Sequence, residues 1–276
     1  MIADIALPVV IFLCIVVLHF LRRREIKNQG VALLNPNYKL GAATSFGTRA
    51  AQQDYFGVKE MYGSLLIVLA DGIGQCGDIA AKFTVDTFRN LFVNKAIIDK
   101  PQYFFRRAAN ASNKQILNTL EERQGESSVA AVMINDSQMT YMLVGNCRVA
   151  VFRNGDLIPV SEGQTIDVLA RHRYEEGRIS KQETLSLLNK QRRYNTIGQD
   201  SFEEIELFSK PLKLKSNDLI VIMSEGVFNT LRWKELEEIL DEGKSPQILA
   251  ETIISHVDKL KMVDKANATV LICRQA

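Results

Sequence analysis

Cysteine is scarce in this sequence, which has four in 276 residues. No two of them show the Cys-x-x-Cys spacing of a zinc site, and their positions indicate no disulfide framework. A large excess of charge of either sign is also lacking, since the net charge is +2 and the pI is near 8.3. Proteins dedicated to nucleic acids normally carry a strong basic excess that neutralises phosphates. The composition therefore argues against a disulfide scaffold, a zinc module and a nucleic-acid-binding protein.

Internal repeats and low-complexity tracts are lacking as well. The chain is 46% hydrophobic and 24% charged, a balance that disordered chains do not have. A chain of this length can bury a full hydrophobic core. We therefore expect one large globular domain or two small ones.

Charged residues are absent from Ile5 to Leu21, a run of roughly 17 residues at the lower limit for a membrane-spanning helix. A segment that is apolar on all sides has no polar face for water, which favours a membrane anchor over a buried core helix. A cleaved signal peptide fits poorly, because Asp4 precedes the run and no small-residue cleavage site follows it. We expect residues 1–24 to form a retained transmembrane helix with a basic flank.

Basic residues follow this run immediately, at Arg22, Arg23, Arg24 and Lys27. Lys and Arg beside a membrane span favour the cytoplasmic side. The sequence therefore predicts a single-pass protein of the cell membrane, with a juxtamembrane linker at residues 25–39. The large domain, residues 40–276, would face the cytoplasm.

A glycine-rich turn follows the apolar run Leu65–Ala70, which is typical of a buried strand. Asp71 stands at the exposed end of this strand. Gly72, Gly74 and Gly77 allow a tight turn that presents a carboxylate and bare carbonyl groups to one point. Hard cations such as Mg²⁺ and Mn²⁺ take oxygen ligands of these two kinds. The alternative is an ordinary strand-turn-helix connection in which Asp71 is solvated.

Apolar periodicity divides the remaining chain into two groups of strands, each followed by a helix pair. Short turns such as Asn154-Gly155 predict that the strands run antiparallel. We therefore predict an α+β domain of two packed antiparallel sheets with helices on the outside. The predicted strands are Gly41–Phe46, Tyr55–Val58, Leu65–Ala70, Ser128–Ile134, Met139–Val144, Cys147–Phe152, Leu157–Val160, Leu219–Ser224 and Ala268–Cys273, and the predicted helices are Ile79–Phe92, Pro101–Arg123, Thr165–Glu176, Lys181–Lys190, Trp233–Leu240 and Gln247–Leu260.

Six short blocks recur in a recognisable order between roughly residues 40 and 274. Together they resemble the metal-dependent protein serine/threonine phosphatases of the PPM type, also called type 2C. The resemblance implies a four-layer α-β-β-α sandwich and the hydrolysis of phosphoserine or phosphothreonine by water held between two Mg²⁺ or Mn²⁺ ions. The blocks are Gly47-Thr48-Arg49 with Gln53-Asp54, Asp71-Gly72-Ile73-Gly74, Gly145-Asn146-Cys147-Arg148, Gly177-Arg178-Ile179-Ser180 with Asn195-Thr196-Ile197-Gly198, Ser224-Glu225-Gly226, and Asn267-Ala268-Thr269-Val270.

The resemblance implies roles for several residues of these blocks. Arg49 matches the arginine that binds the substrate phosphate, and Asp54 matches the aspartate of the same block. Asp71 matches the aspartate that bridges the two ions, with the Gly72 carbonyl beside it. Glu225 stands where the family has an aspartate, and being one methylene longer it reaches a metal if the backbone moves.

Two ligand positions depart from the family pattern. Gln53 replaces a glutamate, and a neutral amide is a weaker ligand than a carboxylate. Ala266 replaces an aspartate with a methyl group, and Asp264 would need a shifted loop to substitute for it. Asp71 and Glu225 remain where the family offers about four carboxylates to two dications. We expect Mn²⁺ or Mg²⁺ to bind weakly, at one site or not at all.

Three functions are compatible with this pattern. The first is a membrane-anchored pseudophosphatase that binds a phosphoprotein, a phosphopeptide or another partner in cytoplasmic signalling. The second is an active phosphatase with an altered metal centre built on Asp71, Glu225, Asp54 and water. The third is a structural anchor with an empty cleft. A manganese-dependent rate separates the first two, and phosphopeptide binding that is sensitive to Arg49→Ala argues against the third.

Overall fold

The structure is a computed structural model. The transmembrane helix predicted at residues 1–24 and most of the predicted linker lie outside the residues that it describes. Among the described residues, no helix combines the length and the apolar character needed to cross a membrane. The described residues are 37–121, 123–188, 192–200, 202, 204–208 and 210–275.

The first sheet has five strands in the order β1-β11-β10-β6-β7. Each neighbouring pair in it is antiparallel. Strand β1 begins at Tyr38, which lies inside the segment predicted as linker. The strands are β1 Tyr38–Ser45, β6 Arg148–Arg153, β7 Asp156–Pro159, β10 Leu219–Met223 and β11 Ala268–Gln275.

The second sheet has six strands and follows the order β2-β3-β4-β5-β8, with β9 also paired to β5. It too is antiparallel throughout. The two shortest strands, β8 and β9, have two residues each and were not predicted. The strands are β2 Asp54–Met61, β3 Ser64–Ile73, β4 Glu126–Asn135, β5 Gln138–Val144, β8 Glu206–Leu207 and β9 Leu212–Lys213.

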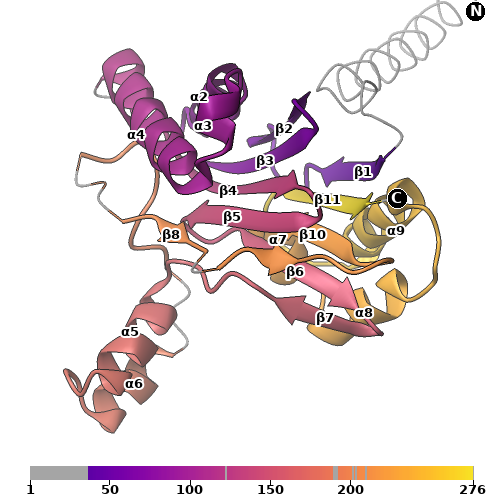
Figure 1. Ribbon diagram of the computed structural model, residues 1–276. Coiled ribbons are helices and arrows are strands. Elements are labelled where there is room, and N and C mark those ends of the chain that lie inside the picture. The colour runs from indigo at the N-terminus through magenta and orange to yellow at the C-terminus, as the bar shows by residue number, and fades with distance from the viewer. Residues whose placement is uncertain are drawn as a thin grey trace, which may run out of the picture.

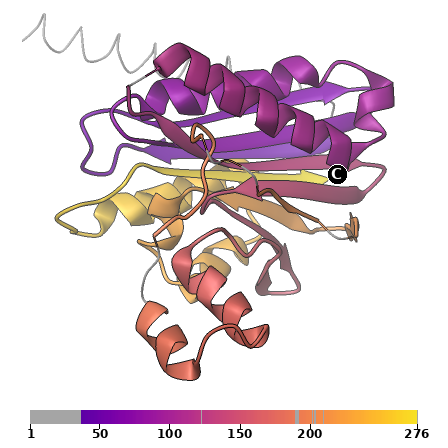
Figure 2. The same cartoon turned by 90° about the vertical axis from the view of Figure 1, so that its left-hand side faces the viewer.

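The two sheets stack face to face, and helices cover both outer faces (Figures 1 and 2). Helices α2 Gly77–Leu91 and α4 Pro101–Leu120, joined through α3 Lys95–Ile98, pack on the second sheet. Helices α8 Trp233–Leu240 and α9 Pro246–Lys259 pack on the first sheet. The predicted α+β sandwich of two antiparallel sheets with outer helix pairs is therefore confirmed.

Strand β3 shows why its sequence is a continuous apolar run. Leu65, Ile67 and Leu69 point into the core between the sheets. Leu66 and Val68 point to the opposite face, into the core beneath α2 and α4. Since side chains alternate along a strand, a strand covered on both faces must be apolar at every position. Burial of each such side chain contributes roughly 1.5–3 kcal/mol.

Helices α5 Ile166–Glu175 and α6 Lys181–Leu187 form an arm that projects from the sandwich and covers neither sheet (Figures 1 and 2). The second helix begins with a capping box, in which Ser180 and Glu183 hydrogen bond reciprocally. Tyr174 and Leu185 are exposed on this arm. The chain returns from it to the sandwich at residues 192–200.

Candidate functional site

Acidic side chains from both sheets meet at one edge of the sandwich. Asp71 lies near the end of β3, between Asp54 on β2 and Ser128 on β4. Glu225 begins the short helix α7 Glu225–Phe228, which directly follows β10 in the other sheet. Strand pairing therefore places two carboxyl groups side by side, although like charges directly opposite each other destabilise a sheet.

Asp54 is buried at the start of β2. Its Oδ2 accepts a hydrogen bond of 2.7 Å from the Ser224 hydroxyl, which in turn accepts one of 2.9 Å from the backbone N–H of Thr269. Its Oδ1 is buried and has no hydrogen-bond partner among the described residues. Burial raises the pKa of Asp54 to about 6. The protein thus carries part of the free-energy cost of an incompletely satisfied carboxyl group.

The pKa of Asp71 is also raised. Burial raises the pKa of Asp71 well above its usual value, and the nearby charge of Asp54 raises it further. The guanidinium of Arg193 acts in the opposite direction but does not outweigh these two effects. The positive charge of Arg193 therefore does not balance the negative charge that the cluster carries when its acids are ionised.

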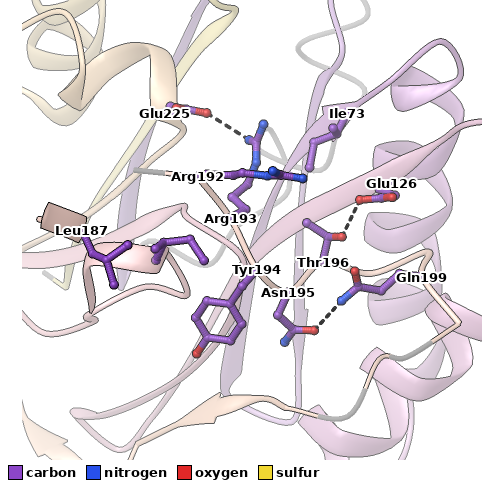
Figure 3. Close-up of a pocket in the computed structure, with 11 residues that line it drawn as sticks. Ile73, Glu126, Leu187, Arg192, Arg193, Tyr194, Asn195, Thr196, Gln199 and Glu225 are labelled. Atoms are coloured by element: carbon purple, nitrogen blue, oxygen red, sulfur yellow. Dashed lines mark hydrogen bonds and ion pairs between the residues drawn. The ribbon is translucent and has the colours of Figure 1, made fainter. Parts of the chain in front are cut away.

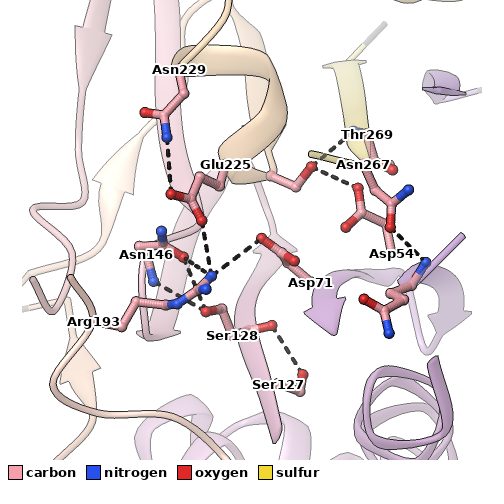
Figure 4. Close-up of polar contacts among 12 residues, drawn as sticks. Asp54, Asp71, Ser127, Ser128, Asn146, Arg193, Glu225, Asn229, Asn267 and Thr269 are labelled. Carbon is pink, nitrogen blue, oxygen red and sulfur yellow. Dashed lines mark hydrogen bonds and ion pairs between the residues drawn. The ribbon is translucent and has the colours of Figure 1, made fainter. Parts of the chain in front are cut away.

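Arg193 enters this acidic cluster from the segment that follows the α5–α6 arm (Figure 4). Its Nη1 donates to Oε2 of Glu225 at 3.0 Å and to Oδ1 of Asn146 at 3.3 Å. The same nitrogen is 3.8 Å from Oδ2 of Asp71. The Arg193 side chain is 25% exposed, so its charge is only partly screened by water.

Gln53 occupies one of the implied metal-ligand positions, and its amide holds the glycine turn. The side-chain Nε2 of Gln53 donates to the Gly74 carbonyl at 2.8 Å, and the backbone carbonyl of Gln53 accepts from the Gly72 N–H at 3.1 Å. Position 72 requires glycine, because a Cβ there would lie 2.2 Å from the Gly77 carbonyl oxygen. The turn is therefore fixed by packing and hydrogen bonds within the chain.

Arg49 and Asp264 lie together at the surface. Nη2 of Arg49 is 3.3 Å from Oδ1 of Asp264, and the two side chains are 52% and 71% exposed. Asp264 thus faces Arg49 and does not take the place of the carboxylate that Ala266 lacks. Arg49, predicted to bind phosphate, remains accessible at this surface position.

The residues present do not fit the two-metal centre that the resemblance implies. Among the described residues, no three or more His, Cys, Asp and Glu side chains are grouped so as to hold a metal ion. Asp71 and Glu225 are the carboxylates left at implied ligand positions, and both are in contact with the guanidinium of Arg193. A dication in the same space would meet that positive charge.

A cavity of about 1020 Å³ borders the cluster on the side of the arm (Figure 3). Its wall includes polar pairs that stabilise its shape. The Thr196 hydroxyl donates to Glu126 at 2.6 Å, and Nε2 of Gln199 donates to Oδ1 of Asn195 at 2.8 Å. The lining residues are Ile73, Glu126, Ile166, Leu187, Arg192, Arg193, Tyr194, Asn195, Thr196, Gln199 and Glu225.

The structure brings three of the predicted site residues together, namely Asp54, Asp71 and Glu225. It leaves Arg49 at the surface. Arg193 was not predicted from the sequence. The neighbouring block that begins at Asn195 gave a signal for this segment, but nothing in the spacing showed that an arginine two residues earlier would reach the acids.

No family model matches the chain. Among curated proteins it is similar to the serine/threonine phosphatase Stp of Listeria welshimeri, with 24% identity over 217 residues that cover 75% of this chain and 83% of the relative. The Stp protein of Listeria innocua is 23% identical over the same shares of the two chains. The matched region spans most of both proteins.

Solved structures of bacterial phosphatases have a similar fold. The serine/threonine phosphatase of S. agalactiae superposes with a TM-score of 0.74 at 21% identity, over 87% of this chain and all of that one. The PPM Ser-Thr phosphatase MsPP of Mycobacterium smegmatis superposes with a TM-score of 0.69 at 17% identity, over 86% and 98% of the two chains. PstP/Ppp of Mycobacterium tuberculosis gives a TM-score of 0.67 at 19% identity, over the same two shares.

Proposed function

Since the chain has the fold of the PPM-type serine/threonine phosphatases, as the resemblance of its sequence blocks implies, we propose that it is a pseudophosphatase. In this role it binds protein segments that carry phosphoserine or phosphothreonine and does not hydrolyse them efficiently. The relatives named as serine/threonine phosphatases support this class of ligand.

The observation that carries the proposal is the set of donor groups at the implied ligand positions. Gln53 uses its amide to hold Gly74, Ala266 has no donor in its side chain, and Asp264 pairs with Arg49 at the surface. Two dications held close together need several carboxylates to offset their repulsion. The loss of these ligands removes the means of activating water between two ions.

Phosphate recognition needs no metal ion, and Arg49 supplies the chemistry for it. A guanidinium group can bind a phosphate through two parallel hydrogen bonds. The Asp264 carboxylate that now faces Arg49 is 71% exposed, so the arriving phosphate would displace a weak surface contact. This exchange is consistent with a site that binds phosphorylated segments reversibly.

An active phosphatase with a single-ion centre is the second candidate, because Asp54, Asp71 and Glu225 lie in one cluster. Such a centre would use Mn²⁺ or Mg²⁺ and would require the guanidinium of Arg193 to move away from two of these acids. The donor set favours the pseudophosphatase, and manganese-dependent turnover would favour this alternative.

The deciding experiment measures phosphopeptide hydrolysis and binding by the full chain in detergent, with and without Mn²⁺. We expect no manganese-dependent hydrolysis, together with binding that requires the phosphate. Arg49→Ala should weaken that binding by about tenfold or more. Lys244→Ala should not, because Lys244 forms a similar exposed ion pair with Glu242 near the opposite end of β11. Rapid hydrolysis that depends on Mn²⁺ would overturn the proposal.

We also propose that residues 1–24 anchor the protein in the cell membrane, with the large domain in the cytoplasm. The support is the uncharged run Ile5–Leu21 followed by three arginines. The full chain should sediment with membranes and be released by detergent. Its recovery in the supernatant of a detergent-free lysate would exclude the anchor.

A further inference from the structure

The guanidinium group of Arg193 lies between the carboxylate of Asp71 on β3 and that of Glu225 on α7, which follows β10 of the other sheet. Its Nη1 is 3.0 Å from Oε2 of Glu225 and 3.8 Å from Oδ2 of Asp71, and Figure 4 shows it pointing into the space between them. We propose that Arg193 is a permanent counter-ion that takes the place of a divalent cation at this point, so that the folded domain needs no metal ion there. This inference rests on the proposed function, since both require a cleft without a pair of catalytic ions.

The backbone on both sides of Arg193 is fixed by hydrogen bonds to Gln164, which precedes α5, and to Ile166, the first residue of α5. The N–H of Ile166 donates to the carbonyl of Arg192 at 2.9 Å, and the N–H of Tyr194 donates to the carbonyl of Gln164 at 3.1 Å. An arginine on a mobile loop would lose the conformational entropy of both its backbone and its side chain when it docked. Here the backbone is already fixed in the folded protein, so docking of the side chain costs no further backbone entropy. This favours a permanent contact over a transient one.

The groups around the guanidinium are also oriented. Oδ1 of Asn146 accepts from Arg193 at 3.3 Å and from the Ser128 hydroxyl at 3.1 Å. The other oxygen of Glu225, Oε1, accepts from Nδ2 of Asn229 at 2.9 Å. An amide oxygen at position 146 gives the arginine a neutral acceptor and adds no further negative charge. The surroundings thus suit a group with a single positive charge and N–H donors, such as a guanidinium.

The charge of the cluster shows why a counter-ion is needed. Asp54, Asp71 and Glu225 are acidic, and Asp54 has a buried oxygen without a hydrogen-bond partner among the described residues. If the Arg193 side chain were shortened, Asp71 and Glu225 would face each other across a space that it had filled. Two carboxylates with nothing between them destabilise the fold and form an incomplete oxygen site for a dication.

Thermal unfolding of the full chain in detergent tests this role without relying on activity. In EDTA, Arg193→Ala should lower the Tm by about 4–8 °C, because it leaves partly buried acids without their partner. Mn²⁺ at roughly 100 times its Kd should restore about 5 °C to this variant. The unaltered protein should shift by less than about 1 °C under the same conditions.

Arg192→Ala is the matched control, since Arg192 is adjacent, exposed and lines the same cavity. It should leave both the Tm in EDTA and the manganese response as they are in the unaltered protein. Arg193→Lys keeps the charge but not the planar fork, so its Tm should fall less than that of Arg193→Ala and respond less to Mn²⁺.

An Arg193→Ala variant that folds and shows no manganese response would overturn the inference, as would an unaltered protein that Mn²⁺ stabilises equally. Should Arg193→Ala fail to fold, the double variant Arg193→Ala/Glu225→Gln decides the matter. This double variant should fold, and Mn²⁺ should not change its Tm, because it removes the repulsion between Asp71 and Glu225 together with the arginine. The proposed function fails separately, through manganese-dependent hydrolysis by the unaltered protein.

Discussion

Arg153 contacts a buried acid and Arg193 contacts two partly buried acids, and the surroundings of the two arginines differ. Arg153 on β6 forms a two-point contact with Asp218, with Nε 2.9 Å from Oδ1 and Nη2 2.6 Å from Oδ2. The Asp218 side chain is 3% exposed. Arg193 uses one nitrogen for Glu225 at 3.0 Å and for Asp71 at 3.8 Å.

The pKa shifts of the acids record this difference. Burial would raise the pKa of Asp218, but hydrogen bonds from Arg153 and from the Lys215 N–H outweigh it and lower the pKa. In the cleft, burial and Asp54 raise the pKa of Asp71 in spite of Arg193. A complete ion pair stabilises the fold. A cluster with too little positive charge retains part of the free-energy cost of burying its carboxylates, which is typical of functional sites.

The largest expected effect comes from turning the Arg193 cluster into a complete metal centre. Gln53→Glu, Glu225→Asp and Ala266→Asp, combined with Arg193→Ala, would supply the missing carboxylates and remove the competing cation. We expect two Mn²⁺ ions to bind by calorimetry, and phosphopeptide hydrolysis to rise at least about 100-fold above that of the unaltered protein.

The matched control carries the same three acidic changes with Arg193 retained. It should gain much less, because the guanidinium still lies between Asp71 and position 225. If the four-residue variant folds but neither binds two ions nor hydrolyses phosphopeptides, the ligand changes are not the main defect. The glycine turn from Gly72 to Gly77 would then be the next element to alter.

The Arg153 pair should be the larger contributor to stability. Arg153→Ala leaves the Asp218 carboxylate buried without its partner, which should lower the free energy of unfolding by about 3 kcal/mol. Urea denaturation monitored by circular dichroism measures this change. Arg178→Ala is the control, because Arg178 pairs with Glu176 at 3.0 Å on the exposed arm and should change stability by less than about 0.5 kcal/mol. Equal losses in the two variants would contradict the comparison.

Much of the fold could be predicted because its signals are local. The apolar run Leu65–Ala70 predicts a strand that the structure extends to Ser64–Ile73, and helical periodicity locates α2 and α4. The two-residue strands β8 and β9 were missed, since such strands exist through their pairing with β5. Local patterns carry no information about a pairing that depends on the rest of the fold.

The candidate site could be predicted in part, for a related reason. Asp54, Asp71 and Glu225 stand beside recognisable turns, so their sequence neighbours mark them. Arg193 is more than a hundred residues from Asp71 in the sequence, and no recognisable turn stands beside it. Asp264 stands two residues from the ligand position at Ala266 in the sequence, but its side chain faces Arg49. Side-chain direction in a loop depends on tertiary contacts that spacing does not encode.

Acid pH should separate charge from packing in the Arg153 pair. The pKa of Asp218 is lower in the folded protein than in the unfolded chain. Its contribution is therefore fully present above the unfolded value of about 3.9 and is lost as the pH falls through the folded value. Asp218→Asn should lower the free energy of unfolding by about 1–2 kcal/mol at pH 7. Urea titrations should show this difference shrinking as the pH drops from about 4 to about 2.5. A difference that persists at the lowest pH would indicate lost packing.

The smallest effect on stability should come from Arg49, which sharpens the contrast with both other arginines. Arg49 is 52% exposed and contacts an aspartate that is 71% exposed, so water screens the pair and its two side chains lose conformational freedom in forming it. Arg49→Ala should change the free energy of unfolding by less than about 0.5 kcal/mol.

The same variant should lose phosphopeptide affinity if Arg49 binds the phosphate. Arg49→Lys should recover part of that affinity, because it keeps the charge and loses the two-point contact. Calorimetry with phosphorylated and unphosphorylated peptides measures both variants. A large loss of stability in Arg49→Ala, with no change in affinity, would make Arg49 a structural residue like Arg153 and would assign phosphate recognition to other residues.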